Sequence, residues 1–238
     1  IACGSASTAQ EPAATPAQQA ARAEQRREHD RAIELLTEII AKNPARAEAY
    51  YRRGRENFCA GQIAQAVADL DKYVELNPDA KSRQWERGIA YYYAGEFAKG
   101  AEQFKLYRTF HDQDVENSVW RYLCVARAEG VEKAQANMLP IENDPRVPMM
   151  QIFGLYRGQL QPEEVEKAAL AGNPTKDELN TRLFYTHLYL GLWHATADRA
   201  EQAKEHIFQA EQHKIGHYMW DVAHVHAERL RAGEKAKQ

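Results

Sequence analysis

Histidine is the residue type whose distribution first suggests chemistry in this chain. A transition-metal site is the sharpest hypothesis for clustered histidines, because neutral imidazole is a common zinc and copper ligand. His187 and His194 are predicted to share one helix face, but no Asp, Glu or Cys in the sequence completes a convincing ligand set with them. We therefore predict no metal site and no cofactor. Seven of the nine histidines lie after residue 186: His187, His194, His206, His213, His217, His224 and His226.

Other interpretations of these histidines involve no metal. His213 and His217 flank Ile215-Gly216, a predicted turn, so their spacing of four need not place them on one helix face. His226 lies on an apolar stripe, which favours a packed core residue over a ligand. A pH-responsive interface is a further alternative, because imidazole titrates near neutral pH.

The common signatures of catalysis do not occur in the sequence. There is no HExxH, no GxSxG and no phosphate-binding glycine loop. The three cysteines, Cys3, Cys59 and Cys124, are too far apart for metal-ligand spacing, and their odd number argues against a disulfide framework. Cys59 and Cys124 fall at predicted packing positions, where nothing marks an activated thiolate. We predict a protein that is not an enzyme.

An internal repeat indicates which elements position the side chains. Asn43-Pro44 recurs as Asn77-Pro78, 34 residues later. This interval is the length of a tetratricopeptide repeat, a helix–turn–helix unit that buries its apolar face only by stacking on a copy of itself. The same interval relates three more pairs: Gly54 and Gly88, Leu70 and Phe104, and Tyr73 and Tyr107.

The hydrophobic pattern is helical from about residue 18 onward, and no segment shows the strict alternation of a half-buried strand. Each Asn-Pro is a predicted helix end, because proline disfavours helical geometry in the residue before it. The pattern is less regular over 113–180, and a third unit starts near Phe184. We predict an all-α fold, a tetratricopeptide-repeat superhelix that is an α-solenoid of antiparallel helix pairs.

The first helices of such units line a concave groove. An aromatic-lined groove with a few charges fits recognition of a peptide or a helix from a partner protein. The alternative is that Tyr51, Trp85 and Tyr92 only pack against neighbouring units. The residues at these positions do not fit the carboxylate clamp known in this family, which needs Lys and Asn. The predicted groove residues are Glu48, Tyr51, Arg55, Phe58, Ser82, Trp85, Ile89 and Tyr92.

Charge and hydropathy narrow the choice of partners. The net charge of −3 gives no electrostatic reason to expect nucleic acid. No apolar run approaches the roughly 20 residues that span a bilayer. The segment Ile1-Ala2-Cys3-Gly4, however, resembles the end of a bacterial lipobox, whose invariant cysteine carries the lipid. The polar, proline-punctuated residues that follow are typical of a flexible tether. The alternative is an ordinary cysteine near a disordered tail.

These features predict a lipobox remnant and disordered tether over 1–20 and a tetratricopeptide array over 21–112. A less regular helical region, with a final repeat-like unit and a capping helix, is predicted over 113–238. If Cys3 is lipidated, Gly4 after it favours the outer membrane, facing the periplasm; this inference rests on the lipobox resemblance alone.

The whole arrangement resembles the NlpI type of envelope tetratricopeptide lipoproteins. The resemblance is carried by the stretch Arg87–Gly95, then by 119–123 (VWRYL), and more loosely by Phe184-Tyr185 with Leu190-Gly191. It implies a dimerising, lipid-anchored scaffold that brings peptidoglycan hydrolases together with a periplasmic protease. We therefore predict a non-catalytic interaction scaffold or adaptor of the bacterial envelope. The alternative is a soluble cytoplasmic chaperone or secretion-partner module with the same fold.

Overall fold

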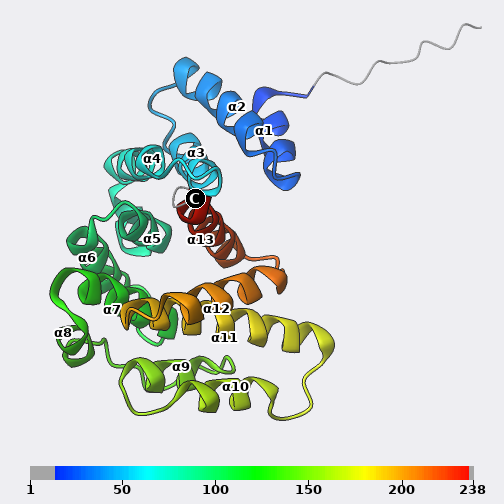
Figure 1. Cartoon of the computed structure of the whole chain (residues 1–238). Helices are drawn as coiled ribbons and strands as arrows, with labels where there is room; N and C mark the ends of the chain where they lie inside the picture. Colours follow the sequence, from blue (N-terminus) through cyan, green and yellow to red (C-terminus); the bar gives the residue numbers. More distant parts are fainter. Residues whose placement is uncertain (1–13, 236–238) are drawn as a thin grey trace, which may run out of the picture.

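The computed structural model describes residues 14–235, and this part of the chain contains helices and no strand, which confirms the all-α prediction. Figure 1 shows their order in space. The helices are α1 (Pro16–Gln25), α2 (His29–Lys42), α3 (Ala47–Cys59), α4 (Ile63–Leu76), η1 (Pro78–Arg83), α5 (Trp85–Tyr93), α6 (Phe97–Tyr107), α7 (Val115–Glu129), α8 (Val131–Ala136), α9 (Met149–Tyr156), α10 (Pro162–Leu170), α11 (Lys176–Thr196), α12 (Ala200–Gln212) and α13 (Tyr218–Lys235).

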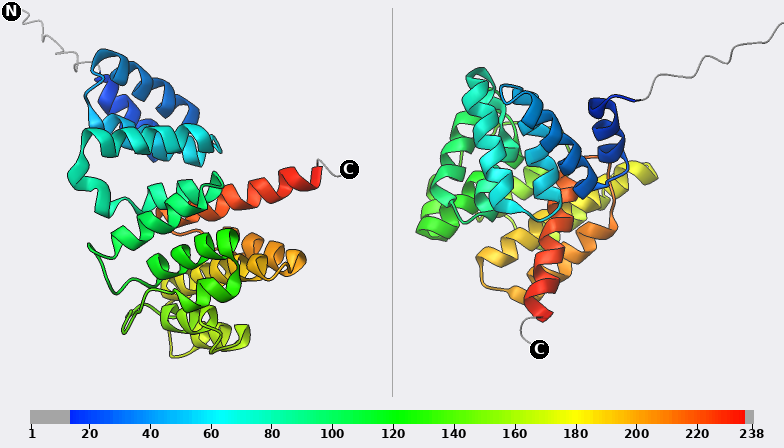
Figure 2. Two further views of the ribbon diagram at one scale, coloured as in Figure 1. Left: turned by 90° about the vertical axis from the view of Figure 1, so that its left-hand side faces the viewer. Right: turned by 90° about the horizontal axis from the view of Figure 1, so that it is seen from above.

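Consecutive helices pack in pairs, as a tetratricopeptide-type solenoid requires. The pairs α1–α2, α3–α4, α5–α6 and α11–α12 each form extensive contacts, and α2, α4 and α6 in turn contact the helix that follows. Within the second and third pairs, a tight turn joins the two helices. Gly61 and Gly95 in these turns adopt φ values of +75° and +78°. Positive φ favours glycine, because a Cβ would crowd the backbone there. Figure 2 shows the stack from two further sides.

One close contact recurs in three of these pairs. A Cβ placed on Gly54 would lie 2.9 Å from Leu70, and one on Gly88 would lie 2.6 Å from the Phe104 ring. A Cβ on Gly191 would likewise lie 2.8 Å from Ile207. In each case the large residue follows the glycine by 16 positions. The predicted repeat register is therefore confirmed: a missing side chain on the first helix admits a large one from the second.

The asparagine–proline pairs end helices, as predicted. Asn43 follows the last residue of α2, and Asn77 follows the last residue of α4. The second junction differs from the regular repeat, because Pro78 begins the 3-10 helix η1 before α5 starts at Trp85.

The predicted tether over 1–20 is too long. Pro16–Gln25 forms α1, and Ala20 is fully buried against α2 in a small core of its own. Thr15 caps this helix by a reciprocal capping box with Gln18, and Pro16 occupies the first turn, where its missing N–H costs no hydrogen bond. The helix-start signal lay inside a stretch whose composition suggested disorder. Residue Cys3 lies outside the described residues.

The less regular half begins with α7, which packs against α6 and so continues the stack. Asp114 caps α7 by accepting a hydrogen bond from the Glu116 amide, and Thr175 caps α11 through a capping box with Glu178. One hydrophobic core extends from Phe58 to Ala227, across the division predicted near residue 112. None of the helices in the described range is long and apolar enough to cross a membrane.

Candidate functional site

The concave side of the stack is occupied by the chain's own last helix. From the turn after α12, α13 runs back along the inside of the curve and contacts α3 and α12 (Figures 1 and 2). The Tyr218 ring lies 5.8 Å from the Phe58 ring and 5.7 Å from the Trp85 ring, centroid to centroid. The Arg55 guanidinium covers the same tyrosine at 4.6 Å. The groove thus already holds a helix.

Further contacts hold α13 along its length. The His217 ring, just before the helix, stacks on Trp85 with the planes 9° apart. Asp221 forms an ion pair with Arg27 from the α1–α2 turn. The Tyr93 hydroxyl lies 2.8 Å from Nδ1 of His226, and the two rings meet edge to face. This confirms the prediction that His226 is a packed residue with a hydrogen-bonding partner.

The eight predicted groove residues therefore divide into groups. Arg55, Phe58 and Trp85 contact α13 or the turn before it. Tyr51 donates a hydrogen bond of 2.7 Å to the buried Glu86. The remaining four lie as follows: Glu48 is exposed on α3, Ser82 is half-buried in η1, Ile89 is fully buried, and Tyr92 packs on Tyr93, Phe97 and Trp120.

Two of these assignments need correction. Phe58 and Ile89 have no exposed surface, so they belong to the core and not to an open binding face. Phe58 is covered by Tyr93 and by Tyr218 of the returning helix, a contact that spacing along the chain does not reveal. Contact of the other six with a partner protein stays a prediction.

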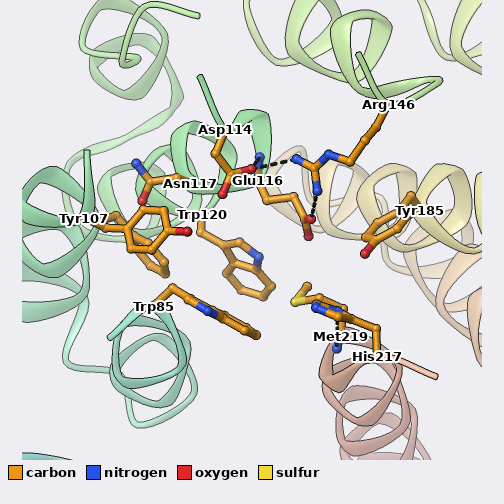
Figure 3. Close-up of a pocket in the computed structure, with 11 residues that line it drawn as sticks. Trp85, Tyr107, Asp114, Glu116, Asn117, Trp120, Arg146, Tyr185, His217 and Met219 are labelled. Carbon is orange, nitrogen blue, oxygen red and sulfur yellow. Dashed lines mark hydrogen bonds and ion pairs between the residues drawn. The ribbon is translucent and has the colours of Figure 1, made fainter. Parts of the chain in front are cut away.

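A pocket of about 180 Å³ remains beside the start of α13, where α5, α6 and α7 approach the segment before α9. Figure 3 shows its aromatic rings, with Trp85 and Trp120 facing each other across the space and Tyr107 and Tyr185 at opposite sides. Only Trp85 among its lining residues was predicted as a binding residue. The lining residues are Trp85, Phe104, Tyr107, Asp114, Glu116, Asn117, Trp120, Arg146, Tyr185, His217 and Met219.

Carboxylates surround a single guanidinium at one wall of this pocket. Arg146 forms ion pairs with Asp114 at 2.7 Å, with Glu116 at 2.6 Å and with Asp144 at 2.6 Å. Tyr189 also donates a hydrogen bond of 2.6 Å to Glu116. Burial raises the pKa of Glu116, and the nearby charge of Asp114 raises it further, despite the arginine. Three carboxylates around one cation leave this wall with an excess of acidic groups.

Two polar atoms at the pocket lack partners. Within residues 14–235, the indole Nε1 of Trp120 and Oδ1 of Asn117 are buried and accept or donate no hydrogen bond. A buried polar group without a partner is costly, but both atoms are enclosed, so a ligand or water molecule could reach them only if neighbouring side chains moved. The pocket therefore combines aromatic faces with an excess of acidic groups over the one arginine.

The geometry favours binding and gives no support to thiol chemistry. Burial raises the pKa of both Cys59 and Cys124, which is the opposite of what an activated thiolate requires. The pocket does not include either thiol. That the protein is not an enzyme stays a prediction.

The histidines show what sequence reasoning missed. His187 on α11 meets His206 on α12, with Glu166 of α10 beside them, whereas the sequence suggested that no carboxylate completes a set. The available signal was a matching interval of seven between His187 and His194 and between His206 and His213. This spacing indicates a histidine cluster only if α11 and α12 pack against each other, which the spacing alone does not reveal.

Comparisons with known proteins give limited similarities. No family model matches the chain. The SGT1 homolog of Bos taurus is 24% identical over 170 residues, which covers 66% of this chain and 50% of that protein. The SGT1 homolog of Homo sapiens is 33% identical over 73 residues, or 31% of this chain and 20% of that protein. The chain thus spans half or less of the length of these curated relatives.

Solved structures with a related arrangement have low sequence identity. A chain described as "MamA RS-1 ArsTM double mutant" has a TM-score of 0.48 at 15% identity, and the match covers 82% of this chain and 89% of that one. A chain from "Structure of Naa15/Naa10 bound to HypK-THB" has a TM-score of 0.39 at 16% identity, covering 92% and 34%. The resemblance to the NlpI type stays a prediction.

Proposed function

We propose that this chain is a non-catalytic protein-interaction scaffold. The observation that carries the proposal is the stack of helix pairs, whose concave face packs the chain's own α13 through Trp85 and Arg55 and leaves a pocket open beside that helix. A surface built this way recognises helices by apolar and aromatic anchors. A rigid solenoid also loses little conformational entropy when a partner binds, which favours affinity.

The pocket supplies the specific contact in this proposal. Its aromatic faces, Trp85, Trp120 and Tyr107 among them, stand next to a wall in which acidic groups outnumber the one arginine. A cation beside aromatic faces and carboxylates is stabilised by the ring quadrupoles and by Coulomb attraction. The partner segment is therefore expected to insert a lysine or arginine side chain into the pocket.

The cellular setting of the scaffold is proposed from the sequence. The likeness of Ile1-Ala2-Cys3-Gly4 to a lipobox supports a lipid on Cys3 and a place at the bacterial outer membrane, facing the periplasm. The resemblance to the NlpI type then implies dimerisation and partners among peptidoglycan hydrolases and a periplasmic protease. The alternative, a soluble cytoplasmic tetratricopeptide module, is favoured by curated relatives that come from cattle and human, not from bacteria.

One preparation from native cells tests both parts of the proposal. A photo-reactive phenylalanine analogue replaces Tyr107 at the pocket, and in a matched control it replaces Glu102, an exposed residue of the same helix that does not line the pocket. We expect discrete crosslinked partners from position 107 and not from 102. Glu116→Gln should reduce that crosslinking, since it removes a carboxyl group from the pocket wall while keeping the shape of the side chain.

The experiment distinguishes failure of the pocket contact from failure of the lipid anchor. Equal crosslinking from both positions, or full crosslinking in the Glu116→Gln protein, would contradict the pocket as the contact. Mass spectrometry of the N-terminal peptide from the same preparation reports the lipid. An unmodified Cys3 would refute the anchor and leave the scaffold proposal in place.

A further inference from the structure

Four histidines form a column of stacked rings between α11 and α12. His187 and His194 are seven residues apart on one helix, and His206 and His213 are seven apart on the other. Seven residues are about two helical turns, so each pair lies on one face. Packing of the two helices interleaves them, with ring centroids 5.9 Å apart for His213 and His187, 5.2 Å for His187 and His206, and 5.4 Å for His206 and His194.

Three potential ligand atoms converge at the middle of this column. The Nδ1 atoms of His187 and His206 are 3.0 Å apart. The carboxylate of Glu166, which comes from α10, places its oxygen so that all three ligand atoms lie within 4.8 Å of one another. Two nitrogens bound to one tetrahedral zinc ion are about 3.3 Å apart, given Zn–N bonds of about 2.0–2.1 Å. The two imidazole nitrogens are thus close to the spacing that such an ion requires.

We propose that Glu166, His187 and His206 bind one zinc ion, with a water molecule in the fourth position. A hydrogen bond between two neutral imidazoles would account for the short Nδ1–Nδ1 distance, and the carboxylate of Glu166 beside that pair completes a set of three ligand atoms. Two imidazoles and one carboxylate are a ligand set that zinc accepts. The ion would tie α10 to the α11–α12 pair. This inference does not depend on the scaffold function.

The test is a zinc titration of the purified full chain after treatment with a chelator, in competition with a chromophoric chelator. We expect one zinc ion per chain and a melting temperature that rises with zinc concentration. His206→Gln and Glu166→Gln should each weaken binding by at least about tenfold, since loss of even an outer-shell partner costs 10–100-fold. The matched controls, His194→Gln and His213→Gln, remove rings of the same column and should retain the affinity.

Several results would contradict the assignment of a zinc site to these three residues. Wild-type protein that takes up no stoichiometric zinc would refute the site. Equal loss in the control variants would show that the stack, and not these three side chains, governs binding. Cobalt substitution gives an independent readout: a thiolate charge-transfer band would place the metal on a cysteine, whereas a d–d spectrum without that band supports nitrogen and oxygen ligands. Circular dichroism identifies any variant that fails to fold. If a variant does not fold, the cobalt spectrum of the wild-type protein tests the ligand set in its place.

Discussion

Three glycines set the distance between paired helices, and each does so by lacking a side chain. Gly54, Gly88 and Gly191 each face a large apolar residue 16 positions later, and a Cβ on any of them would lie within 3 Å of that side chain. The sequence revealed the first two through the 34-residue repeat, because small and large positions recurred together. The third lies in the weaker unit that the sequence predicts to start near Phe184.

Gly88→Leu is expected to destabilise the protein strongly. The new side chain must occupy the space of the Phe104 ring, which is itself fully buried. Overpacking of this kind costs about 1–3 kcal/mol, and occasionally more. Urea denaturation at pH 7 should show a lower midpoint. The control is Ala98→Leu at an exposed position of α6, which should stay within about 0.5 kcal/mol of the wild type. A Gly88→Leu protein as stable as the control would contradict the crossing.

The residues of the candidate site were harder to predict from the sequence than the glycines at the helix crossings. Trp85 was predicted as a binding residue, and it lines the pocket while also stacking on His217. Arg146 and Glu116 gave no signal in the sequence, because the ion pair joins residues 30 apart across an irregular segment. Periodicity reports which face of a helix is apolar, but it does not report which distant loop covers that face.

At the scale of elements, the position of α13 answers a question that the sequence left open, namely whether the groove holds the chain's own C-terminal region. Its apolar stripe was visible in the sequence, and Met219, Val222 and Ala223 are indeed buried. The repeat pattern alone predicted only a capping helix at the end of the stack. The return of α13 to the groove depends on the turn after α12 and on its contacts with α3, neither of which has a periodic signature.

The docking of α13 makes a prediction about local opening. Trp85→Ala and Tyr218→Ala each remove aromatic contacts at the start of this helix, while α3 and α5 keep their own pairs. Amide hydrogen exchange over 218–230 should become roughly tenfold faster or more, since tenfold corresponds to about 1.4 kcal/mol. Ala232→Ser, an exposed change on the same helix, serves as the control. Unchanged exchange in both aromatic variants would show that other contacts hold α13.

At the scale of the whole molecule, neutral buried histidines couple stability to pH. Burial, together with the charge of Arg229, lowers the pKa of His226 to about 4, and burial with two neighbouring histidines lowers that of His187 to about 4 as well. Between about pH 6.5 and 4 the unfolded chain therefore binds protons that the folded chain does not. The free energy of unfolding should fall as the pH is lowered through this window. The raised pKa of Glu116 acts in the opposite sense.

His226→Gln isolates one contribution to this dependence. We expect the difference in unfolding free energy between pH 7 and pH 5 to shrink by about 2 kcal/mol relative to the wild type, because one lowered pKa is removed. Urea denaturation at the two pH values measures it. His111→Gln, which changes an exposed histidine, should leave the difference unaltered. A His226→Gln protein with the wild-type difference would show that this residue does not contribute to the pH dependence.

The architecture as a whole was more predictable than its ends. Helix pairs, their turns and their register follow from local periodicity, so the solenoid could be predicted from sequence. The front boundary could not, because α1 is a short polar helix whose start signal, Thr15 with Pro16 and Gln18, lies in a segment of disorder-like composition. The continuous core across residue 112 was also hidden, since the repeat pattern fades there while the packing does not.

The separate small core of α1 and α2 has a mechanical consequence. The first helix is held by Ala20 and Ala23 and by a two-bonded ion pair between Glu24 and Arg52. Tension applied to the front of the chain loads these few contacts before it reaches the large core that begins at Phe58. Helix α1 would then detach first and lengthen the chain before the tension reaches the packing of α2 on α3.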